Sequence, residues 1–379
     1  MSMRLLFLTG SRGEWGYIRP ILKLCIDAGV DYNVCATNMH LLPSHGLSVE
    51  EIESDGFEVS DKVYMSIEGG NHHTMTKSMG VLLSSLVDIY ARIQPDWIVL
   101  AGDRGEQLIG AIAGAYTYVP IAHIQAGERS GNIDGSARHA IGKLVHLHFA
   151  SNQDAADRLR SFGEEEFRIH NVGAPQLDEL VAAEFTSPDE LKSKLGLDTD
   201  NGFLLVVQHP VTEEYDQAAE QIAATVEAVS NIPMQKLWVL PNNDAGGVLV
   251  REGILRNRDS NTLLFDNLPR QDYLGLLRQC SAIVGNSSSG ILEAPTFRTP
   301  TVNIGNRQKD RIQGQNVINC DHNPEEIKSA IAKATSDEFK AEIAGSENPY
   351  GDGQSSARIL GILRDTPINS QLLSKRVTI

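Results

Sequence analysis

Short apolar runs alternate with amphipathic helical patterns along almost the whole chain, and this alternation constrains the fold more than any other feature. The runs have the length and residue types of buried strands. Strand, helix and strand in succession form the unit from which parallel sheets are built. The expected strands are residues 5–9, 33–37, 97–100, 121–124, 168–172, 203–207, 236–240, 262–265, 282–284 and 301–304. Helical patterns cover residues 17–28, 106–118 and 136–145.

The pattern restarts after the polar stretch "EFTSPDELKSKLGLDTDNG". A chain of 379 residues is long for one domain, and its 41% apolar content can supply two cores. We therefore predict two doubly wound, Rossmann-like α/β domains, residues 1–185 and 186–379, with the C-terminal helix packing back on the first domain. Ligands of such sheets bind at the carboxyl ends of strands, so we expect the site in a cleft between the domains.

The formal net charge of −16 argues against binding of nucleic acid or an anionic membrane through a general basic surface. The four cysteines form no CxxC pair and lie mostly in or beside apolar runs, so we expect free thiols. The apolar start of the chain is short for a signal peptide, and no run reaches the ~20 apolar residues of a membrane span. These features predict a cytoplasmic protein.

The first strand ends in "TGSRGEWG". Residues 38–80 are the hardest part of the chain to interpret, and "EGGNHH" within them suggests a mobile loop. Arg12 lies where it can reach a phosphate, near a helix that we expect to begin at Gly16. A plain turn with a surface arginine is the alternative. The dinucleotide fingerprint GxGxxG is absent, so NAD and FAD are poor candidates, and we expect no cofactor.

The next strand ends carry a dense set of ionisable groups. Asp103 follows a strand in "LAGDRGE", where capping of the next helix is the simple alternative. "PIAHIQAGERSGNIDGSARHA" contains His123, Gln125, Glu128, Asp134, Arg138 and His139 around a glycine-rich turn. Asp134 can cap a helix, or form a surface ion pair with Arg138 four residues later. His146 and His148 are interpreted as core or boundary histidines, and no residue cluster requires a metal.

In the second half, one strand ends at His209 and another just before Asn242. His209 is a candidate acid, base or phosphate donor. The stretch "GNSSSGILEAP" places Ser287 and Ser288 where a strand turns into an expected helix over 289–296, a position suited to a diphosphate. Glu293, more than a turn inside that helix, offers an acceptor pair for vicinal hydroxyls, and Arg307 adds a positive charge. Serine caps with a surface glutamate are the alternative.

These stretches, from "TGSRGEWGYIRPIL" through "GDRGE", "QHPVT" and "PNNDAG" to "GNSSSGILEAPTFRTPTVNIGNRQ", run in order over residues 9 to about 308. Together with "IAHIQAGERSGNIDGSARHAIGKLVHLHF" they resemble the hydrolysing UDP-N-acetylglucosamine 2-epimerases of sialic-acid-type sugar synthesis. Non-hydrolysing relatives carry "HVEAGLR" and, soon after it, a "PEE" motif. This chain lacks the first, and its one "PEE", at residues 324–326, lies far beyond that region, so the hydrolysing branch is preferred. The resemblance implies a glycosyltransferase-B-like fold and a UDP-linked sugar as substrate.

The resemblance also implies roles for individual positions. Residues facing the sugar would be Asp103, Glu128, Asp134, Arg138 and His209. Residues holding the nucleotide would be Arg12, Arg104, Asn242, Ser287, Ser288, Glu293 and Arg307. His40 falls on a further family histidine. A homodimer or homotetramer is expected.

Gln125 departs from the family, because some members carry a carboxylate at this position. An amide cannot exchange a proton at neutral pH, so either this position is not the universal base of the family or a neighbouring group is the base here. Asp103 is the first choice, because it directly follows its strand and Arg104 beside it favours the ionised form. Glu128 and Asp134 are the other carboxylates expected near the sugar.

The implied reaction removes the C2 proton while UDP leaves C1, adds water to the resulting acetamidoglucal, and returns a proton to the other face of C2. The product would be N-acetylmannosamine if the sugar is N-acetylglucosamine. A UDP- or GDP-linked N,N'-diacetylbacillosamine that feeds legionaminic acid is the alternative substrate. A glycosyltransferase of the same fold and a non-catalytic nucleotide-sugar sensor are the alternative functions. Release of UDP from the donor alone separates these functions from hydrolytic epimerisation.

Overall fold

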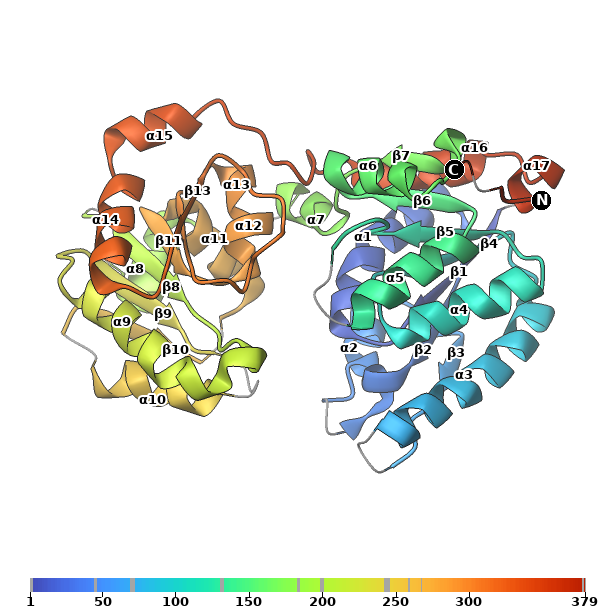
Figure 1. The fold of residues 1–379 in the computed structure, drawn as a ribbon, viewed down its shortest axis with the longest axis horizontal. Coiled ribbons are helices and arrows are strands. Elements are labelled where there is room, and N and C mark those ends of the chain that lie inside the picture. Colours follow the sequence, from blue (N-terminus) through green and yellow to red (C-terminus); the bar gives the residue numbers. More distant parts are fainter. Residues whose placement is uncertain are drawn as a thin grey trace. The chain divides into compact units, whose positions relative to one another are not determined.

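The computed structural model divides the chain into two compact units. Unit 1 contains Met1–Glu179 and Tyr350–Ile379, and unit 2 contains Leu180–Pro349. The C-terminal thirty or so residues therefore return to unit 1 (Figure 1). The structure describes residues 3–43, 46–68, 72–129, 133–182, 185–197, 201–241, 246–257, 260–266, 268–376 and 378, without the side chains of 133, 134, 212, 213 and 215.

The described part of unit 1 contains a seven-stranded parallel sheet in the order β3-β2-β1-β4-β5-β6-β7. Its strands are β1 (Arg4–Thr9), β2 (Asp31–Thr37), β3 (Asp61–Val63), β4 (Trp97–Ala101), β5 (Ile121–Ile124), β6 (Leu147–Ala150) and β7 (Ile169–Asn171). Its helices are α1 (Arg12–Ala28), α2 (Val49–Ser54), α3 (His72–Ile93), α4 (Gly105–Tyr116), α5 (Ile133–Leu144), α6 (Gln153–Ser161), α16 (Ser355–Asp365) and α17 (Ser370–Leu373), and α7 (Gln176–Ala182) contains the unit boundary. The strand order reverses at β1 and β4, where doubly wound sheets bind ligands.

The described part of unit 2 contains a six-stranded parallel sheet in the order β10-β9-β8-β11-β12-β13. The strands are β8 (Phe203–Val207), β9 (Gln235–Val239), β10 (Thr262–Phe265), β11 (Ala282–Gly285), β12 (Thr301–Ile304) and β13 (Val317–Cys320). The helices are α8 (Pro188–Leu195), α9 (Ala218–Ser230), α10 (Gly247–Arg256), α11 (Arg270–Gln279), α12 (Ser288–Leu292), α13 (Ala294–Phe297), α14 (Pro324–Ala334) and α15 (Asp337–Ile343). Two parallel sheets with interleaved helices confirm the prediction of two doubly wound α/β halves.

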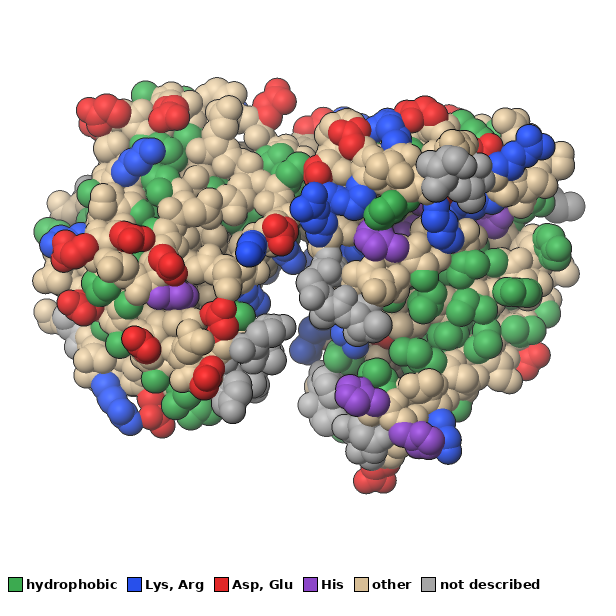
Figure 2. Space-filling model, viewed as in Figure 1, with side chains coloured by type: hydrophobic (Ala, Val, Ile, Leu, Met, Phe, Trp, Pro, Cys, Tyr) green, Lys and Arg blue, Asp and Glu red, His purple; other side chains and the backbone are tan. Residues whose placement is uncertain are grey.

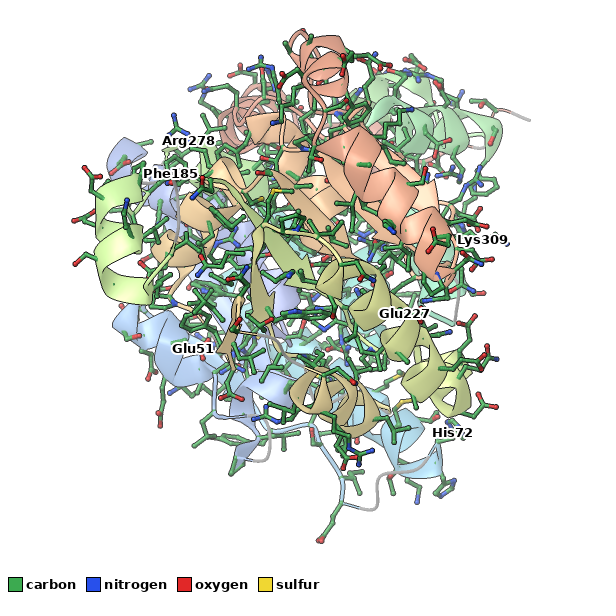
Figure 3. All side chains as sticks on the ribbon, turned by 90° about the vertical axis from the view of Figure 1, so that its left-hand side faces the viewer. Glu51, His72, Phe185, Glu227, Arg278 and Lys309 are labelled. Carbon is green, nitrogen blue, oxygen red and sulfur yellow. The ribbon has the colours of Figure 1, made fainter. Side chains whose placement is uncertain are left out.

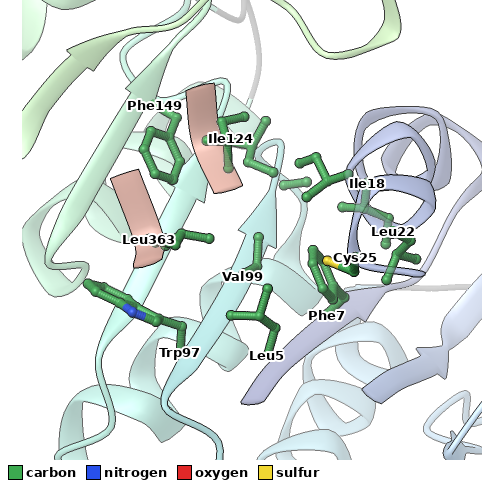
Figure 4. Packing of buried hydrophobic residues seen from close by; sticks show 14 of the residues in the cluster. Leu5, Phe7, Ile18, Leu22, Cys25, Trp97, Val99, Ile124, Phe149 and Leu363 are labelled. Atoms are coloured by element: carbon green, nitrogen blue, oxygen red, sulfur yellow. The ribbon is translucent and has the colours of Figure 1, made fainter. Parts of the chain in front are cut away.

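The strands of unit 1 are buried on both faces because helices cover both sides of the sheet. Leu5 and Phe7 point to the core under α1, whereas Leu6 and Leu8 point to the core under α3 and α4. Leu363 of α16 packs into the first of these cores (Figure 4). Each large apolar side chain buried in this way contributes about 1.5–3 kcal/mol to stability. The C-terminal segment is therefore part of the unit 1 core.

Packing in unit 2 includes contacts at its first helix. Phe185 precedes α8, and its ring lies edge to face on Phe297, with 5.3 Å between the ring centroids. The guanidinium of Arg278 lies 5.3 Å from the centroid of Phe185, and Figure 3 shows the two side chains together. An arginine over an aromatic ring gains a cation–π attraction besides the buried area.

Some elements were not expected from the sequence. β3 and β13 are short, and β6 alternates His148 with apolar residues, so none has the long apolar run that identifies a strand. Helix α1 begins at Arg12 rather than near Gly16, because the Ser11 hydroxyl caps it by accepting from the N–H of Glu14. His72 and His73 of "EGGNHH" begin α3 instead of belonging to a loop, and residues 69–71 lie outside the described part.

None of the described helices has the length and apolar character needed to cross a membrane. Exposed apolar side chains nevertheless gather on one face of unit 1, over α3 and α4 (Figure 2). They include Val81, Val87 and Tyr116, whose exposed fractions are 39%, 42% and 82%. All four cysteines are free thiols, and Cys25, Cys35 and Cys280 are buried.

A buried ionic network holds the end of the chain on unit 1. The Glu164 carboxylate, 2% exposed, accepts from Lys143 at 2.8 Å and from His148 at 3.0 Å, and lies 2.6 Å from the ammonium of Lys375. Burial alone would raise the pKa of Glu164, but the hydrogen bond from His148 and the positive charge of Lys375 outweigh it and lower the pKa to about 2. Arg168 adds hydrogen bonds to the carbonyls of Leu372 and Gln371.

We expect Glu164→Gln to lower the free energy of unfolding at pH 7 by about 3 kcal/mol, because breaking a buried ion pair leaves its partners uncompensated. A carboxylate with a lowered pKa in the folded state stabilises the protein above its unfolded pKa, and loses that contribution as the pH falls toward its folded pKa. The difference between wild type and Glu164→Gln should therefore shrink from pH 5 to about pH 2. Urea denaturation across this range measures it.

Glu166→Gln is the matched control, because the Glu166 side chain is 69% exposed and pairs with Arg160 at the surface. It should leave the free energy of unfolding close to that of wild type at every pH of the series, because solvent screens an exposed ion pair. A Glu164→Gln difference that stays constant, or that grows as the pH falls, would show that the network does not anchor the C-terminal segment through the Glu164 charge.

Candidate functional site

Arg138 joins the carboxyl ends of β4 and β5 in unit 1. Its guanidinium is 5% exposed and donates to the carboxylate of Asp103 and to the carbonyl of Gln125, both at 2.5 Å. Gln125 follows β5 with φ = 60°, a left-handed conformation that turns the backbone sharply at this point. The sequence suggested Asp134 as the partner of Arg138, whereas Asp103 forms the described ion pair. The side chain of Asp134, in the first turn of α5, lies outside the described part.

Two acidic residues, Glu14 and Glu106, lie close together near the ends of β1 and β4. Glu14 and Glu106 are 2% and 3% exposed. The N–H of Gly10 donates to Glu14 Oε2 at 2.5 Å, and Glu106 Oε1 accepts from Asn38 and from Arg104, both at 3.0 Å. Burial, and then the charge of Glu106, raise the pKa of Glu14 well above its usual range. Two adjacent carboxyl groups in a low dielectric do not both ionise readily, so burial and the neighbouring charge favour the protonated form of Glu14.

A pocket of about 1110 Å³ opens beside Glu106 in unit 1. Arg104, Glu106 and Asn38 provide its polar side. Its apolar side comes mainly from Met65, Met75, Met79 and Leu108. The pocket therefore combines a charged wall, at the carboxyl end of β4, with a flexible apolar wall built by residues around α3.

Two histidines near these strand ends are held neutral. His40 is fully buried, with Nε2 2.9 Å from the hydroxyl of Thr9 and Nδ1 2.8 Å from that of Ser48, and burial lowers its pKa to about 4. His123 is also fully buried and lies 2.6 Å from the carbonyl of Gly102, and burial lowers its pKa to about 3. Neither imidazole carries a charge at neutral pH, so both serve mainly to order the loops after β1, β2 and β4.

The other sugar-side and phosphate-side candidates of unit 1 are more dispersed. Glu128 accepts a hydrogen bond from the hydroxyl of Ser151 at the end of β6. Arg12 is exposed on the first turn of α1 and forms an ion pair with Glu51 of α2, which is labelled in Figure 3. Arg104, predicted as a nucleotide ligand, is bonded to Glu106 instead.

In unit 2, Asn286 connects the ends of β8, β11 and β12. Its side chain accepts from the N–H of His209 and donates to the carbonyl of His209, both at 2.8 Å. Its own carbonyl accepts from Arg307 at 3.2 Å and from Gln308 at 2.9 Å. Three of the predicted positions, His209, Ser287 and Arg307, are therefore brought to one edge of the sheet by a residue that was not predicted.

Gly285 permits this arrangement. Its φ is 128°, and a Cβ there would lie 2.7 Å from the carbonyl carbon of Val207 on the adjacent strand. No side chain fits at that distance, so only glycine lets β11 turn against β8 before Asn286.

The serine loop begins a shorter helix than expected. Ser287 caps α12, which ends at Leu292, and Glu293 lies at the junction with α13 rather than inside one continuous helix. Pro295 explains the break, because it has no N–H to donate to the preceding turn. The Glu293 carboxylate pairs with Arg270 of α11, and its Oε2 is buried without a hydrogen-bond partner in the described part.

Tyr273 lies against the same loop, with its hydroxyl near Ser289 and Ser287, and burial and the charge of Glu293 raise its pKa. Tyr273, Arg270 and Asn286 are polar groups that the sequence analysis missed. Little in the sequence pointed to a site role for Tyr273 and Arg270, because both lie within a helix whose pattern looks amphipathic. Asn242, the remaining predicted nucleotide ligand, lies outside the described residues.

Metal binding has no visible basis in the part of the chain that the structure describes, where no three His, Cys, Asp or Glu side chains converge as ligands. The candidate residues described above supply carboxylates, guanidinium groups, amides and hydroxyls. The unit 1 groups can transfer protons and orient a polar ring, and the unit 2 groups can bind an anion and hydroxyls.

Comparison with known proteins places this arrangement in a family. The model of the UDP-N-acetylglucosamine 2-epimerase family matches residues 23–364. The chain is 35% identical over 377 residues, 99% of each sequence, to the hydrolysing UDP-N,N'-diacetylbacillosamine 2-epimerase of Legionella pneumophila. It is 34% identical to the hydrolysing GDP/UDP-N,N'-diacetylbacillosamine 2-epimerase of Campylobacter jejuni, with 90% of each covered. It is 31% identical to the UDP-N-acetylglucosamine 2-epimerase of Neisseria meningitidis, with 88% of each covered.

Solved structures share the fold. A UDP-N-acetylglucosamine 2-epimerase structure from Listeria monocytogenes gives a TM-score of 0.79 at 19% identity, covering 96% of both chains. That from Neisseria meningitidis, bound to UDP-GlcNAc, gives 0.77 at 19% identity, covering 96% of this chain and all of the other. These neighbours confirm the glycosyltransferase-B-like fold that the sequence predicted. On the family match and the identity over nearly its whole length, the chain belongs to the UDP-N-acetylglucosamine 2-epimerase family.

Proposed function

We propose that this protein is a hydrolysing 2-epimerase, which converts a UDP-linked 2-acetamido sugar and water into the free 2-epimer and UDP. The observation that carries the proposal is the set of acidic and basic groups around the carboxyl ends of β1, β4 and β5, above all Arg138 with Asp103 and Glu106 with Arg104. Elimination and hydration need groups that accept and return a proton. Relatives at 34–35% identity bear the name of hydrolysing enzymes.

In this proposal unit 2 binds UDP. The leaving diphosphate gains negative charge as the C1–O bond breaks, and Arg307 and the N–H groups of the Ser287 loop stabilise it. Glu293 Oε2, buried without a partner in the described part, accepts from ribose hydroxyls. Asp103 keeps Arg138 in position in unit 1, where the guanidinium binds oxygen atoms of the sugar ring or its acetamido group.

The sugar that this proposal favours is N,N'-diacetylbacillosamine, which has a second acetamido group at C4 and a methyl group at C6. The unit 1 pocket has an apolar wall, formed by Met65, Met75, Met79 and Leu108. This wall suits the methyl groups of these two substituents better than it suits the hydroxyls of N-acetylglucosamine. The relatives from Legionella pneumophila and Campylobacter jejuni carry that sugar in their names. UDP-N-acetylglucosamine is the second candidate, because the Neisseria meningitidis relative is named for it.

The reaction leaves an isotopic signature. Turnover of either UDP-sugar in heavy water should give a product with one deuterium at C2, and labelled water should place its oxygen at C1. Mass spectrometry and NMR of the product measure both. UDP released only when an acceptor sugar is added would indicate a glycosyltransferase, and binding without turnover would indicate a sensor.

Substitution of Glu293 tests the UDP-binding half of the proposal. Glu293→Gln and Ser288→Ala should each weaken UDP binding, measured by calorimetry, by about 10- to 150-fold, because each removes a hydrogen bond that involves a charged partner. Glu252→Gln on α10 is the matched control, since Glu252 pairs with Arg256 at the surface. Unchanged affinity in both loop variants would leave Ser287, Ser288 and Glu293 as residues that only shape the α12–α13 turn.

A further inference from the structure

We propose that Glu106, on the wall of the unit 1 pocket and with Glu14 behind it, is the base that removes the C2 proton of the sugar. This inference rests on the proposed epimerase function and adds the residue that performs its first step. Glu106 would contact the substrate directly, because it lines the pocket of about 1110 Å³. Glu14 would act through Glu106 and is therefore a positioning residue.

Gly10 sets the geometry of the two acids. It follows β1, its N–H donates to Glu14 Oε2 at 2.5 Å, and a Cβ at this position would lie 2.8 Å from Glu106 Cγ. Both carboxyl groups thus approach the backbone of Gly10, one from α1 and the other from α4. Glu14 Oε1 is buried and has no hydrogen-bond partner in the described part of the chain. A buried, unpaired carboxyl oxygen needs a proton or a ligand to offset its desolvation.

The surrounding groups place the charge on Glu106. Arg104 and Asn38 both donate to Glu106 Oε1 at 3.0 Å, and Glu14 receives a hydrogen bond from the neutral N–H of Gly10. The charge of Glu106 also acts on the imidazole of His40, but burial lowers the pKa of His40 to about 4 and keeps it neutral. Burial and the charge of Glu106 raise the pKa of Glu14 and favour its protonated form, whereas Arg104 and Asn38 donate to Glu106, so we assign Glu106 as the proton acceptor of the pair.

The two other acids considered for this step are less suited to it. Asp103 is bonded to the buried guanidinium of Arg138, which stabilises its carboxylate and makes it a weaker base. Position 125 is an amide, and its backbone carbonyl accepts from the same guanidinium. Glu106 lies three residues after Asp103, in the first turn of α4. It is also paired with an arginine, but the Arg104 side chain is 36% exposed whereas that of Arg138 is 5% exposed, so solvent screens the Arg104 pair more.

The step balances as an elimination. The Glu106 carboxylate takes the proton from C2, the C2–H electron pair becomes the second bond between C1 and C2, and the C1–O bond breaks with its electrons leaving on UDP. Glu106 is then a neutral carboxyl group and returns its proton to solvent. Water adds its oxygen to C1 and loses one proton to solvent, while a different acid delivers a proton to the opposite face of C2 and is then reprotonated from solvent.

Glu106→Gln tests the assignment, because it keeps the shape and the hydrogen bond to Asn38 but cannot take a proton. We expect kcat for UDP release to fall about 10²–10⁴-fold, while UDP affinity and the thermal unfolding midpoint stay near wild type. The deuterium isotope effect on kcat with a C2-deuterated substrate should rise. Hydration of added 2-acetamidoglucal in the presence of UDP should fall much less, because that half-reaction needs no C2 deprotonation.

Glu14→Gln and Glu166→Gln complete the comparison. Glu14→Gln replaces a neutral carboxyl by a neutral amide, so its loss of kcat should be clearly smaller than that of Glu106→Gln. Glu166→Gln removes an exposed carboxylate of unit 1 and should leave kcat unchanged. If Glu106→Gln does not fold, Glu106→Asp keeps the charge but shortens its reach, and should show the same lowered kcat with a raised isotope effect.

Three outcomes would overturn the inference. One is a Glu106→Gln enzyme with kcat within about tenfold of wild type, less than the loss of a general base normally costs. Another is an equal loss in elimination and in glucal hydration with an unchanged isotope effect, which would indicate a structural role. The third is a raised isotope effect in Asp103→Asn and not in Glu106→Gln. A wild-type enzyme that releases no UDP from any UDP-sugar would instead refute the proposed function itself.

Discussion

Parallel pairing of strands is the constraint on which the rest of this molecule depends. Every strand of a parallel sheet must be followed by a return connection, so all carboxyl ends meet at one edge and all helices cover the two faces. In unit 1 this places the loops after β1, β4 and β5 side by side, although β1 ends at Thr9 and β4 ends only at Ala101. In unit 2 the same rule brings the loops after β8, β11 and β12 together. Charged residues that follow strands therefore become neighbours without any local sequence pattern that links them.

The close approach of these loops is made possible by two glycines and stabilised by a few side chains that hydrogen-bond backbone groups. Gly10 leaves room for Glu106, and Gly285 leaves room for the carbonyl of Val207. Asn286 then ties the loop of His209 to its own strand with two hydrogen bonds. Burying these polar groups costs free energy unless each has a partner, and Asn286 meets this condition through its hydrogen bonds. In the described part of the chain, Glu14 Oε1 and Glu293 Oε2 are buried without a hydrogen-bond partner, which makes them candidates for contact with a ligand.

Much of the fold followed from the sequence, because strands buried on both faces leave uninterrupted apolar runs such as Phe203–Val207. The three-residue strand β3 leaves no such run. The helix break at Glu293 is indicated in the sequence by Pro295, although the apolar pattern on both sides of it favours one continuous helix. The site was predictable only in part. Asp103, Ser287 and Arg307 follow strands and could be selected as candidates for that reason. Asn286, Tyr273 and the contact between Glu14 and Glu106 could not, because each depends on a partner far along the chain whose distance only the folded structure defines.

The amide at position 125 has a physical explanation in the backbone around it. Gln125 adopts a left-handed conformation and directs its carbonyl to Arg138, whose guanidinium also binds Asp103. A carboxylate side chain at 125 would place a second negative charge close to Asp103 in a buried region served by one guanidinium, and such a charge would raise the pKa of one of the two acids. With glutamine there, Arg138 balances Asp103 alone, and the pair of acids at this edge of the sheet is Glu14 with Glu106, beside the cation of Arg104. The chain thus separates a fixed ion pair, suited to orienting the sugar, from an acid pair, suited to moving a proton.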